Sequence, residues 1–243
     1  MSVCIIIPCY NEAGRLPADQ FVAYAQEHPA VRFCFVDDGS ADGTRARLEG
    51  LQMAHPGQME ALILPQNTGK AGAVRAGMLH CAQTGTSDYL GFLDADLATP
   101  LDAIGDLTAV LDARPELDLV MGSRIKHLGT DIRRKAFRHY TGRIIATFIS
   151  NILQLPVYDS QCGAKLFRRG VVAPMFTEPF ISPWLFDVEV LARLTRLRGR
   201  PDVLNRVVEW PLRRWVEQSD SRIRPSYMLR VWYELFRIYR TYR

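Results

Sequence analysis

The sequence contains no long hydrophobic run. Although 48% of its 243 residues are apolar, no segment reaches the roughly 18 consecutive apolar residues that a bilayer-spanning helix needs. The nearest candidate, "IIATFISNILQLPVY" from Ile144 to Tyr158, is short and is interrupted by Asn151 and Gln154. We therefore expect no membrane-spanning helix, whereas the apolar content is sufficient for a sizeable core.

Signals of secretion are also missing. The N-terminus, "MSVCIIIPCYNE", has neither the basic region nor the long apolar segment of a signal peptide. Five cysteines are present, and their spacings match no metal-ligand pattern. They are Cys4, Cys9, Cys34, Cys81 and Cys162. An odd number of cysteines without a secretion signal predicts reduced thiols in a cytoplasmic protein.

The chain has no large excess of one charge. Its 30 lysines and arginines against 26 acids give a net charge of +4, which is too small to indicate a nucleic-acid partner. The distribution is uneven, because six arginines and the single acid Glu234 lie between Arg222 and the C-terminus. The C-terminal segment is therefore expected to be cationic.

Short apolar runs alternate with helical patterns through the first half of the chain. The runs that resemble strands are Val3–Pro8, Val31–Asp37, Ala61–Leu64, Tyr89–Asp94 and Leu117–Met121. The helical segments between them are Ala18–His28, Asp42–Ala54, Lys70–Gln83 and Pro100–Ala113. Nearly continuous apolar strands separated by helices predict an α/β fold with a mainly parallel central sheet and helices on both faces.

The second half has a different pattern. A wide apolar stripe predicts a helix from Phe137 to Leu153. A further helix is expected near Leu185–Arg198, and "VLNRVVEW" (Val203–Trp210) predicts a strand. Because neither an internal repeat nor a low-complexity linker is found, we expect this half to extend the same domain.

Polar clusters follow the first four predicted strands. They are "PCYNE", "DDGS", "NTGKAG" and "DADLAT", in chain order. Ligands of mainly parallel sheets bind at the carboxyl ends of the strands, which meet at one edge. The four clusters therefore predict one ligand site at that edge.

Two familiar phosphate-binding motifs are absent. No Gly-rich turn follows the first strand, which argues against a dinucleotide fold, and no G-x-x-x-x-G-K-[ST] loop occurs. Asp94 and Asp96 offer another device, because side chains two apart on a strand share a face and their like charges repel without a cation. Mg²⁺ binds through one or two carboxylates plus phosphate oxygens. We predict a cation here that faces a diphosphate, the alternative being a polar turn that closes the strand.

Two other clusters have functional and structural interpretations. Asp37 and Asp38 can accept hydrogen bonds from a nucleobase or ribose, or they can form a turn before a helix N-cap at Ser40 or Asp42. Lys70 can contact the diphosphate or be a solvated lysine in the first turn of a helix.

Taken together, the motifs resemble a known family. "IIIPCYNE", "FVDDGSADGT", "NTGKAGAVRAGM", "FLDADLATP" and "MGSR" occur in the order seen in family-2 glycosyltransferases. "DSQCGAKLFRR" and "PWLFDVEVLARL" are similar to polyprenyl-phosphate glycosyltransferases, most of all the dolichyl-phosphate β-glucosyltransferase branch. The resemblance covers nearly the whole chain. It implies the GT-A (nucleotide-diphospho-sugar transferase) fold in a single domain, residues 1–243, with a nucleotide-sugar-binding half (1–125) and an acceptor-side half (126–243).

The resemblance also implies roles for individual residues. With Lys70 added, the donor-binding set is Pro8, Tyr10, Glu12, Asp37, Asp38, Lys70, Asp94 and Ala95. Asp94 and Asp96 form the metal and diphosphate motif, in which Asp96 is the direct ligand. The catalytic set is Asp96, Arg124, Asp159 and Asp187.

Arg124 is expected near the diphosphate or the acceptor phosphate, where a guanidinium can grip phosphate oxygens with two parallel hydrogen bonds. Asp159 and Asp187 are expected to orient the sugar or the acceptor, and the alternative for Asp187 is a carboxylate at a helix start. Cys162 is expected to be a small core residue, because nothing nearby indicates an activated thiolate.

The implied reaction is inverting, divalent-metal-dependent (Mg²⁺ or Mn²⁺) transfer of a hexose from a nucleotide-sugar donor, UDP-glucose by resemblance, to a polyprenyl or dolichyl phosphate. Such an acceptor is already anionic, so positioning and leaving-group stabilisation suffice without a strong base. One departure is Ala98, where mannosyl relatives often carry Gln. This departure makes a mannose donor less expected and leaves metal coordination to rely on water.

Other functions are still open at this point. One alternative is a family-2 enzyme that uses GDP-mannose, a UDP-N-acetylhexosamine or a non-lipid acceptor, which "DSQCGAKLF" disfavours. Another is a non-catalytic sugar-nucleotide- or membrane-binding module, which the complete set of acids disfavours. The sequence does not decide whether the protein forms a homo-oligomer.

The C-terminal segment "SYMLRVWYELFRIYRTYR" (Ser226–Arg243) predicts an amphipathic, basic helix. Its apolar face at helical spacing is Leu229, Trp232, Tyr233 and Phe236. The helix can dock on its own domain, with Glu234 paired to Arg230 and Arg237. Alternatively, it can lie in the interface of an anionic membrane as aromatic, Arg-rich helices do. The second interpretation predicts peripheral association with the cytoplasmic face of a membrane.

Overall fold

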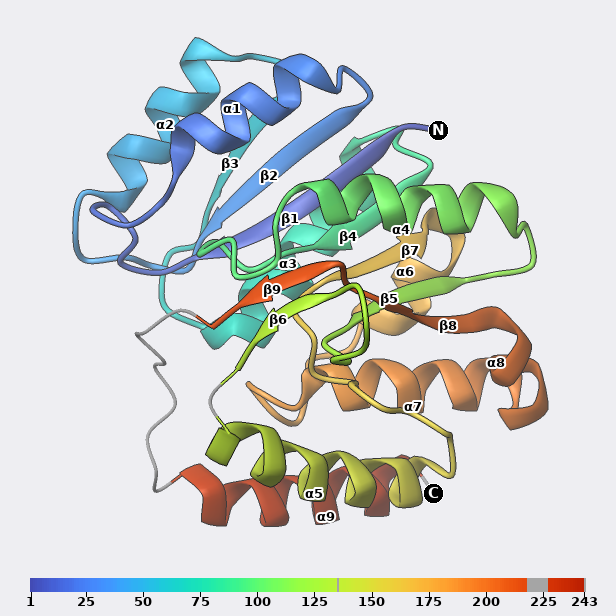
Figure 1. The fold of residues 1–243 in the computed structure, drawn as a ribbon. Coiled ribbons are helices and arrows are strands. Elements are labelled where there is room, and N and C mark those ends of the chain that lie inside the picture. The colour runs from blue at the N-terminus through green and yellow to red at the C-terminus, as the bar shows by residue number, and fades with distance from the viewer. Residues whose placement is uncertain (135, 218–226, 243) are drawn as a thin grey trace.

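A central sheet with helices on both faces organises the molecule (Figure 1). The computed structural model describes the backbone of residues 1–134, 136–217 and 227–242, and the side chains of 1–134, 140–217 and 230–242. The strands are β1 (Val3–Cys9), β2 (Val31–Asp37), β3 (Met59–Ile63), β4 (Tyr89–Phe92), β5 (Leu119–Ser123), β6 (Asp131–Arg133), β7 (Lys165–Arg168), β8 (Val207–Pro211) and β9 (Arg214–Val216). The helices are α1 (Ala18–Glu27), α2 (Thr44–Ala54), α3 (Gly69–Thr84), α4 (Asp102–Ala113), α5 (Ala136–Leu153), α6 (Arg169–Phe176), α7 (Phe186–Arg198), α8 (Arg200–Arg206) and α9 (Tyr227–Tyr242).

The main sheet has seven strands in the order β3-β2-β1-β4-β7-β5-β8. Strands β1 to β4 are parallel, β7 is antiparallel to both of its neighbours, and β5 is parallel to β8. This arrangement confirms the predicted mainly parallel sheet. It also brings the carboxyl ends of β1 to β4 to one edge, which we call the carboxyl edge.

Alternating side chains of β1 enter two different cores. Val3, Ile5 and Ile7 face a core that is closed by α1, α2 and α4, and Cys4 and Ile6 face a second core beneath α3, α6 and α7. Both faces are apolar because helices cover both, as expected for parallel strands.

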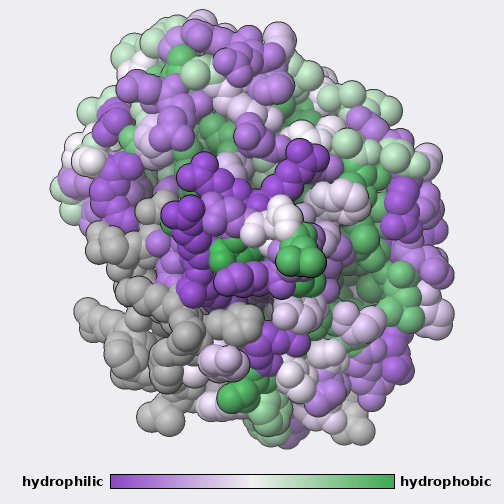
Figure 2. All heavy atoms as spheres, in the orientation of Figure 1, coloured by the Kyte–Doolittle hydropathy of each residue, from purple (hydrophilic) through white to green (hydrophobic). Residues whose placement is uncertain are grey.

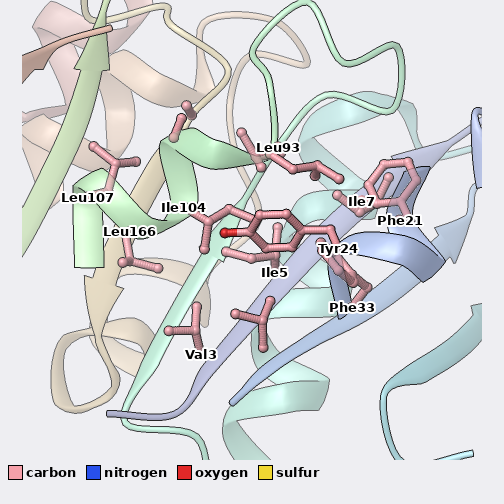
Figure 3. Packing of buried hydrophobic residues seen from close by; sticks show 14 of the residues in the cluster. Val3, Ile5, Ile7, Phe21, Tyr24, Phe33, Leu93, Ile104, Leu107 and Leu166 are labelled. Atoms are coloured by element: carbon pink, nitrogen blue, oxygen red, sulfur yellow. The ribbon is translucent and has the colours of Figure 1, made fainter. Parts of the chain in front are cut away.

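Aromatic side chains fill the first core, part of which Figure 3 shows. Phe21 of α1 meets Phe33 and Phe35 of β2 edge-on, with ring centroids 5.2 Å apart in both pairs. Each fully buried side chain of this size stabilises the fold by about 1.5–3 kcal/mol. The packing fixes β1 and β2, and therefore the loops that leave their carboxyl ends.

Helices α5 and α9 form an additional layer against α7 (Figure 1). Their contact is a small apolar cluster of Ile149, Leu185, Val188, Val231, Leu235 and Ile238. The predicted helices of the second half are therefore confirmed. No helix among the described residues is both long and apolar enough to cross a membrane.

The structure corrects the predictions in the second half and at several strand ends. Strand β3 is Met59–Ile63 rather than Ala61–Leu64, and β5 is Leu119–Ser123 rather than Leu117–Met121. The segment "VLNRVVEW" is a strand only from Val207, because Val203 to Arg206 belong to α8. A proline in the first turn favours that helix, and an Arg206–Asp202 pair at 2.6 Å supports its last turn. The predicted strand Tyr89–Asp94 ends earlier, at Phe92. Strand β7, with only four residues, was not predicted.

Candidate active site

The two carboxylates Asp94 and Asp96 lie in a turn beyond β4, not on the strand itself. Leu97 has a left-handed φ of 50°, and the Ala98 N–H donates to Asp96 Oδ1 at 3.0 Å. The argument that strand alternation gives both side chains one face is therefore wrong. The turn nevertheless keeps them close enough for the charge of Asp94 to raise the pKa of Asp96.

Asp94 is contacted from two sides. The Lys70 ammonium, in the first turn of α3, forms an ion pair with Asp94 Oδ1. Burial acts to lower the pKa of Lys70, but attraction by Asp94 and Asp187 outweighs it, so the pKa is raised and the lysine stays charged. On the other side, a Cβ added to Gly163 would lie 2.1 Å from Asp94 Oδ2. Lys70 is thus not a solvated first-turn lysine, and any side chain at position 163 would displace the Asp94 carboxylate.

Asp96 lies in surroundings that disfavour its negative charge. Burial, with a smaller contribution from Asp94, raises its pKa. The carboxylate is thus costly to keep ionised without a compensating cation. Two neighbouring carboxylates with only oxygen donors suit Mg²⁺ or Mn²⁺ with phosphate oxygens as further ligands. The residues at this position therefore fit the divalent cation that the resemblance implies.

The loop after β2 is joined to the start of α3. Asp38 Oδ1 accepts hydrogen bonds from Thr68 N at 2.7 Å and Thr68 Oγ1 at 2.8 Å, and burial raises the pKa of Asp38. Asp37 Oδ1 accepts one from Ser40 N at 3.1 Å. Gly39, which follows the two acids, has φ 64°, and a Cβ on it would lie 2.6 Å from Asn67 N. Both acids therefore shape the carboxyl edge, as the structural interpretation predicted.

The helix-cap part of that interpretation is wrong, because the N-cap residue of α2 is Gly43. Asp42, one residue earlier, accepts the N–H of Thr44, the first residue of α2, through Oδ1 at 2.9 Å. Ser40 instead accepts a hydrogen bond through Oγ from the N–H of Asn11 at 2.9 Å.

The loop after β1 lies against the loop after β2. Asn11, with φ 51°, accepts a hydrogen bond through Oδ1 from Ala41 N at 3.0 Å. Tyr10 is 37% exposed beside it, whereas Glu12 is buried and lies 3.6 Å from Arg15. Pro8, near the end of β1, pairs with Val36. Sequence reasoning missed Asn11, although its tolerance of positive φ is a usable signal.

Ala95 lies between the two acids and is 7% exposed. The donor-side residues predicted from the sequence thus lie in the last residues of β1 and β2, in the loops after β1, β2 and β4, and, for Lys70, in the first turn of α3. Their arrangement agrees with a ligand site at the carboxyl edge.

Arg124, directly after β5, is locked to Asp159. Its Nε and Nη2 donate to Asp159 Oδ2 at 2.7 Å and Oδ1 at 2.6 Å, and its backbone N–H donates to Oδ2 at 2.9 Å. Burial would raise the pKa of Asp159, but the guanidinium holds it below its usual range. The edge of the guanidinium formed by Nε and Nη2 is therefore occupied by this carboxylate. The expectation that Arg124 grips a phosphate with two parallel hydrogen bonds stays a prediction, and it would have to use the other edge, formed by Nη1 and Nη2.

A small basic pocket lies beside this pair. Arg124, Arg134 and Arg143 line it together with Tyr158. Arg143 of α5 donates to the Tyr158 carbonyl oxygen at 2.8 Å, and its guanidinium lies 3.5 Å from the centroid of the Tyr158 ring. Three arginines around one pocket can bind an anionic group such as a phosphate.

The loop that carries Tyr158 and Asp159 is held from β8. The Glu209 carboxylate accepts their backbone N–H groups at 2.7 and 2.5 Å. Sequence reasoning missed Arg143, Tyr158 and Glu209, because no local motif connects residues that lie 15 and 51 positions apart and meet only in the fold.

Exposed arginines extend the basic character next to the pocket. Figure 2 shows hydrophilic side chains in the middle of this face, in the area that β6 and β9 occupy in Figure 1. Arg133 of β6, Arg213 directly before β9 and Arg214 of β9 are exposed there. Arg133 pairs with Asp131 at 2.8 Å and Arg213 with Asp106 at 3.1 Å.

Asp187 belongs to a buried ion pair. Lys165 Nζ of β7 lies 2.6 Å from Asp187 Oδ1 and donates to the Cys162 carbonyl oxygen at 2.7 Å. Burial raises the pKa of Asp187, against the attraction of Lys165 and Lys70. Asp187 lies in the first turn of α7, as its structural interpretation predicted, and Lys165 was not predicted. Cys162 is fully buried and burial raises its pKa to about 11, which confirms it as a core residue.

A mainly parallel sheet with one antiparallel strand and a paired-carboxylate loop after β4 define a nucleotide-sugar transferase fold, GT-A. The comparisons with known proteins agree. The family described as "Glycosyl transferase family 2" matches residues 4–176. The chain belongs to this family and is a glycosyltransferase.

Full-length relatives share most of the chain. A dolichyl-phosphate beta-glucosyltransferase of Trichomonas vaginalis is 30% identical over 245 residues, which cover 96% of this chain and 69% of the relative. The dolichyl-phosphate beta-glucosyltransferase of Drosophila melanogaster is 31% identical over 258 residues, with 100% and 76% covered.

Solved structures share the fold at lower identity. The mannosyl-3-phosphoglycerate synthase of Rubrobacter xylanophilus has a TM-score of 0.70 at 17% identity, over 99% of this chain and 73% of that one. The glucosyl-3-phosphoglycerate synthase of Mycobacterium tuberculosis, in complex with Mn²⁺, UDP-glucose and phosphoglyceric acid, has a TM-score of 0.71 at 15% identity, with 98% and 79% covered.

Proposed function

We propose that this glycosyltransferase moves glucose from UDP-glucose to a polyprenyl or dolichyl phosphate, with inversion at the anomeric carbon. The observation that carries the proposal is the pairing of two opposite electrostatic sites: the acids Asp94 and Asp96 at the carboxyl edge and a three-arginine pocket beside them. Burial acts to lower the pKa of Arg124, but attraction by Asp159 and, less strongly, by Asp94 raises it. Asp94 is therefore close enough to Arg124 for the two charges to interact. Relatives named dolichyl-phosphate beta-glucosyltransferase support this choice of sugar and acceptor.

On the donor side, Asp94 and Asp96 would hold Mg²⁺ or Mn²⁺, with Asp96 as the direct ligand. A bound cation neutralises charge on the diphosphate as it leaves. Lys70 keeps Asp94 neutralised and is placed to exchange partners when a diphosphate arrives. The nucleoside would lie along the first two loops, against the proposed set Pro8, Tyr10, Glu12, Asp37, Asp38 and Ala95.

On the acceptor side, the basic pocket would bind the lipid phosphate. A phosphate oxygen is already anionic, so it forms the new bond to the anomeric carbon while the bond from that carbon to the diphosphate oxygen breaks. The chain therefore needs to supply position rather than a strong base. In this scheme Asp159 fixes Arg124, and Arg143 together with Arg134 completes the anion site. The Lys165–Asp187 pair would hold the backbone at Cys162, next to Gly163, because Lys165 also donates to the Cys162 carbonyl oxygen.

A product assay tests the proposal. The protein would be incubated with Mn²⁺, a short polyprenyl phosphate and a panel of UDP-glucose, GDP-mannose and UDP-N-acetylglucosamine, and the lipid product identified by mass and anomeric configuration. We expect β-glucosyl polyprenyl phosphate. A different sugar transferred at a higher rate would replace the donor, and donor hydrolysis without lipid product would replace the acceptor.

We also propose that residues 1–243 act as one domain on the cytoplasmic face of a membrane. Strands β7 and β8 of the acceptor-side half lie in the same sheet as β1 to β4. Helix α9 supports the membrane part of the proposal because it has two apolar faces. One face, with Val231, Leu235 and Ile238, is buried in the α5–α9 layer.

The second face of α9 is exposed. Trp232, Tyr233 and Phe236 are 42%, 62% and 56% exposed. Phe148 of α5 meets Trp232 edge-on at 4.7 Å, and Ile144 is exposed beside it. The side chain of Leu229, the fourth residue of the predicted face, lies outside the described residues. The docked and membrane-bound interpretations are therefore compatible.

The docked face also contains charge. Glu234 is buried, pairs with Arg230 at 2.6 Å and accepts a hydrogen bond from Ser182. Arg237 lies 5.9 Å from the Tyr233 ring centroid. Deleting α9 would therefore expose a core cluster, so surface substitutions are the better test of membrane binding.

The test compares Trp232→Ser/Phe236→Ser with Met53→Ser, whose residue is 77% exposed on α2. Binding to phosphatidylcholine–phosphatidylserine vesicles would be measured by sedimentation at low and high salt. We expect the double variant to lose vesicle binding and transfer to a membrane-embedded acceptor, and to keep hydrolysis of the soluble donor. Each arginine near the anionic surface adds about 1 kcal/mol. Absence of wild-type binding at low salt would remove the membrane proposal.

A further inference from the structure

Three of the five cysteines converge at a point remote in the sheet from the carboxyl edge. Cys4 lies at the start of β1, Cys34 in β2 and Cys81 near the end of α3, and all three are buried. The Sγ atoms of Cys4 and Cys81 are 3.5 Å apart. The Sγ atoms of Cys34 and Cys81 and a carboxylate oxygen of Glu60 lie within 4.8 Å of one another.

The sheet register creates this cluster. Cys34 of β2 is paired with Ile6 of β1 and with Glu60 of β3. Cys4 precedes Ile6 by two residues and shares its face, the one that α3 covers. Within the part of the chain that the structure describes, no other group of three metal-ligating side chains lies this close together.

We propose that Cys34, Cys81 and Glu60 form a zinc-binding site, with Cys4 as its fourth ligand. Binding replaces the thiol protons by the metal: one Zn²⁺ and three thiols give three zinc–thiolate bonds, and three protons pass to solvent. Zinc–sulfur bonds of about 2.3 Å in a tetrahedral site hold two sulfurs about 3.8 Å apart. The Cys4–Cys81 separation is close to this value. The ligand atoms of Cys34, Cys81 and Glu60 lie within 4.8 Å of one another and need to approach by about 1 Å, and Cys4 would join them as the fourth ligand through its contact with Cys81.

Neighbouring groups complete the requirements of such a site. His80 Nε2 lies 2.5 Å from Glu60 Oε1, which is the kind of partner that orients a metal-ligating carboxylate. Three thiolates and one carboxylate exceed the charge of Zn²⁺ by two. Arg32, which lines the same pocket as Cys4, Cys81 and Glu60, offsets part of that excess.

The ion also has a route of entry. Cys4, Cys81 and Glu60 line a surface pocket of about 330 Å³, together with Arg32 and residues of the loop before β3. A buried thiol cluster that meets a surface pocket can exchange an ion without unfolding. This feature separates the cluster from an ordinary packing of core cysteines.

The sulfur-rich site differs in chemistry from the oxygen-only pair at the carboxyl edge. Mg²⁺ and Mn²⁺ prefer oxygen ligands and Zn²⁺ prefers thiolates, so each site selects its own ion. A zinc ion here would connect β1, β2, β3 and α3. It would stabilise this half of the sheet by mass action and take no part in transfer.

Cobalt titration tests the site, because thiolate-bound Co²⁺ gives charge-transfer absorption that oxygen ligands do not give. We expect one equivalent of this signal in the wild type, displaced by Zn²⁺, and the signal lost in Cys34→Ser/Cys81→Ser. Cys9→Ser is the matched control, since Cys9 is equally buried on the other face of β1. Its signal should not change.

A milder variant covers the case in which the double variant fails to fold. Glu60→Gln removes a half-buried ligand and is expected to weaken zinc binding by at least the roughly 10- to 100-fold that the loss of an outer-shell partner costs, with its circular dichroism unchanged. A folded wild type without thiolate absorption, the same absorption in the folded double variant, or equal zinc affinity of Glu60→Gln would overturn the proposal. None of these readouts depends on glycosyl transfer.

Discussion

The Arg124→Lys substitution separates guanidinium geometry from charge at the proposed acceptor site. Lysine retains the positive charge but can form only one of the two side-chain hydrogen bonds to Asp159, which measure 2.7 and 2.6 Å. The side chains are 14% and 11% exposed, so solvent screens the pair weakly. We therefore expect a loss of both stability and transfer activity.

The loss can be estimated from the structure. A hydrogen bond to a charged group contributes about 1.5–3 kcal/mol, and one such bond is removed. For a protein of this size, about 2–4 °C in melting temperature corresponds to 1 kcal/mol. Arg124→Lys should thus lower the melting temperature by roughly 3–12 °C. Transfer activity should fall more than the unfolded fraction explains, because a lysine at position 124 cannot keep both hydrogen bonds to Asp159 and does not reproduce the guanidinium position in the basic pocket.

The pH dependence follows from the lowered pKa of Asp159. A carboxyl whose folded pKa lies below its unfolded value of about 3.9 stabilises the fold above that value. This contribution is lost as the pH falls through the folded pKa. The difference in stability between wild type and variant should therefore be largest at neutral pH and shrink below about pH 4.

Thermal and chemical unfolding would be measured for Arg124→Lys beside Arg45→Lys. Arg45 makes the same kind of contact, Nε to Glu49 Oε1 at 2.8 Å, but the two side chains are 64% and 44% exposed. The control should change stability by less than about 0.5 kcal/mol. Equal effects of the two substitutions, or wild-type transfer by Arg124→Lys, would refute the reasoning.

Three further substitutions test the site. Asp96→Asn should nearly abolish transfer at saturating Mn²⁺ and leave stability equal or higher, because burial raises the pKa of the acid; near-normal turnover would remove the metal role. Gly163→Ala should lower stability and Mn²⁺ affinity together, because its Cβ would lie 2.1 Å from Asp94 Oδ2; calorimetry with unchanged Mn²⁺ affinity would contradict this. Lys165→Met should cost about 3–5 kcal/mol in urea unfolding by leaving Asp187 buried and unpaired, and a double variant with Asp187→Leu should recover much of it; no recovery would show that the pair is not the cause.

Much of the fold and the donor side could be predicted from local patterns. Nearly continuous apolar runs gave β1 and β2 within one or two residues, since burial on both faces leaves a strong signal in the sequence. The polar residues that follow those runs fall at the carboxyl edge because parallel strands all end there. The same signal fails for β7, whose "KLFR" is too short to distinguish from a loop or a helix.

The sequence by itself determined the class of protein: an α/β glycosyltransferase with acids after β4 and an amphipathic C-terminal helix. Hydrophobic periodicity and the order of the motifs can be recognised from the sequence alone, without a structure. Only the tertiary structure decided which side chains pair. Sheet register and the packing of α3 bring the three cysteines together, and the packing of a loop and of helix α7 against the sheet brings Asp159 to Arg124 and Asp187 to Lys165. Such contacts join residues 22 to 77 positions apart, and no local pattern encodes them.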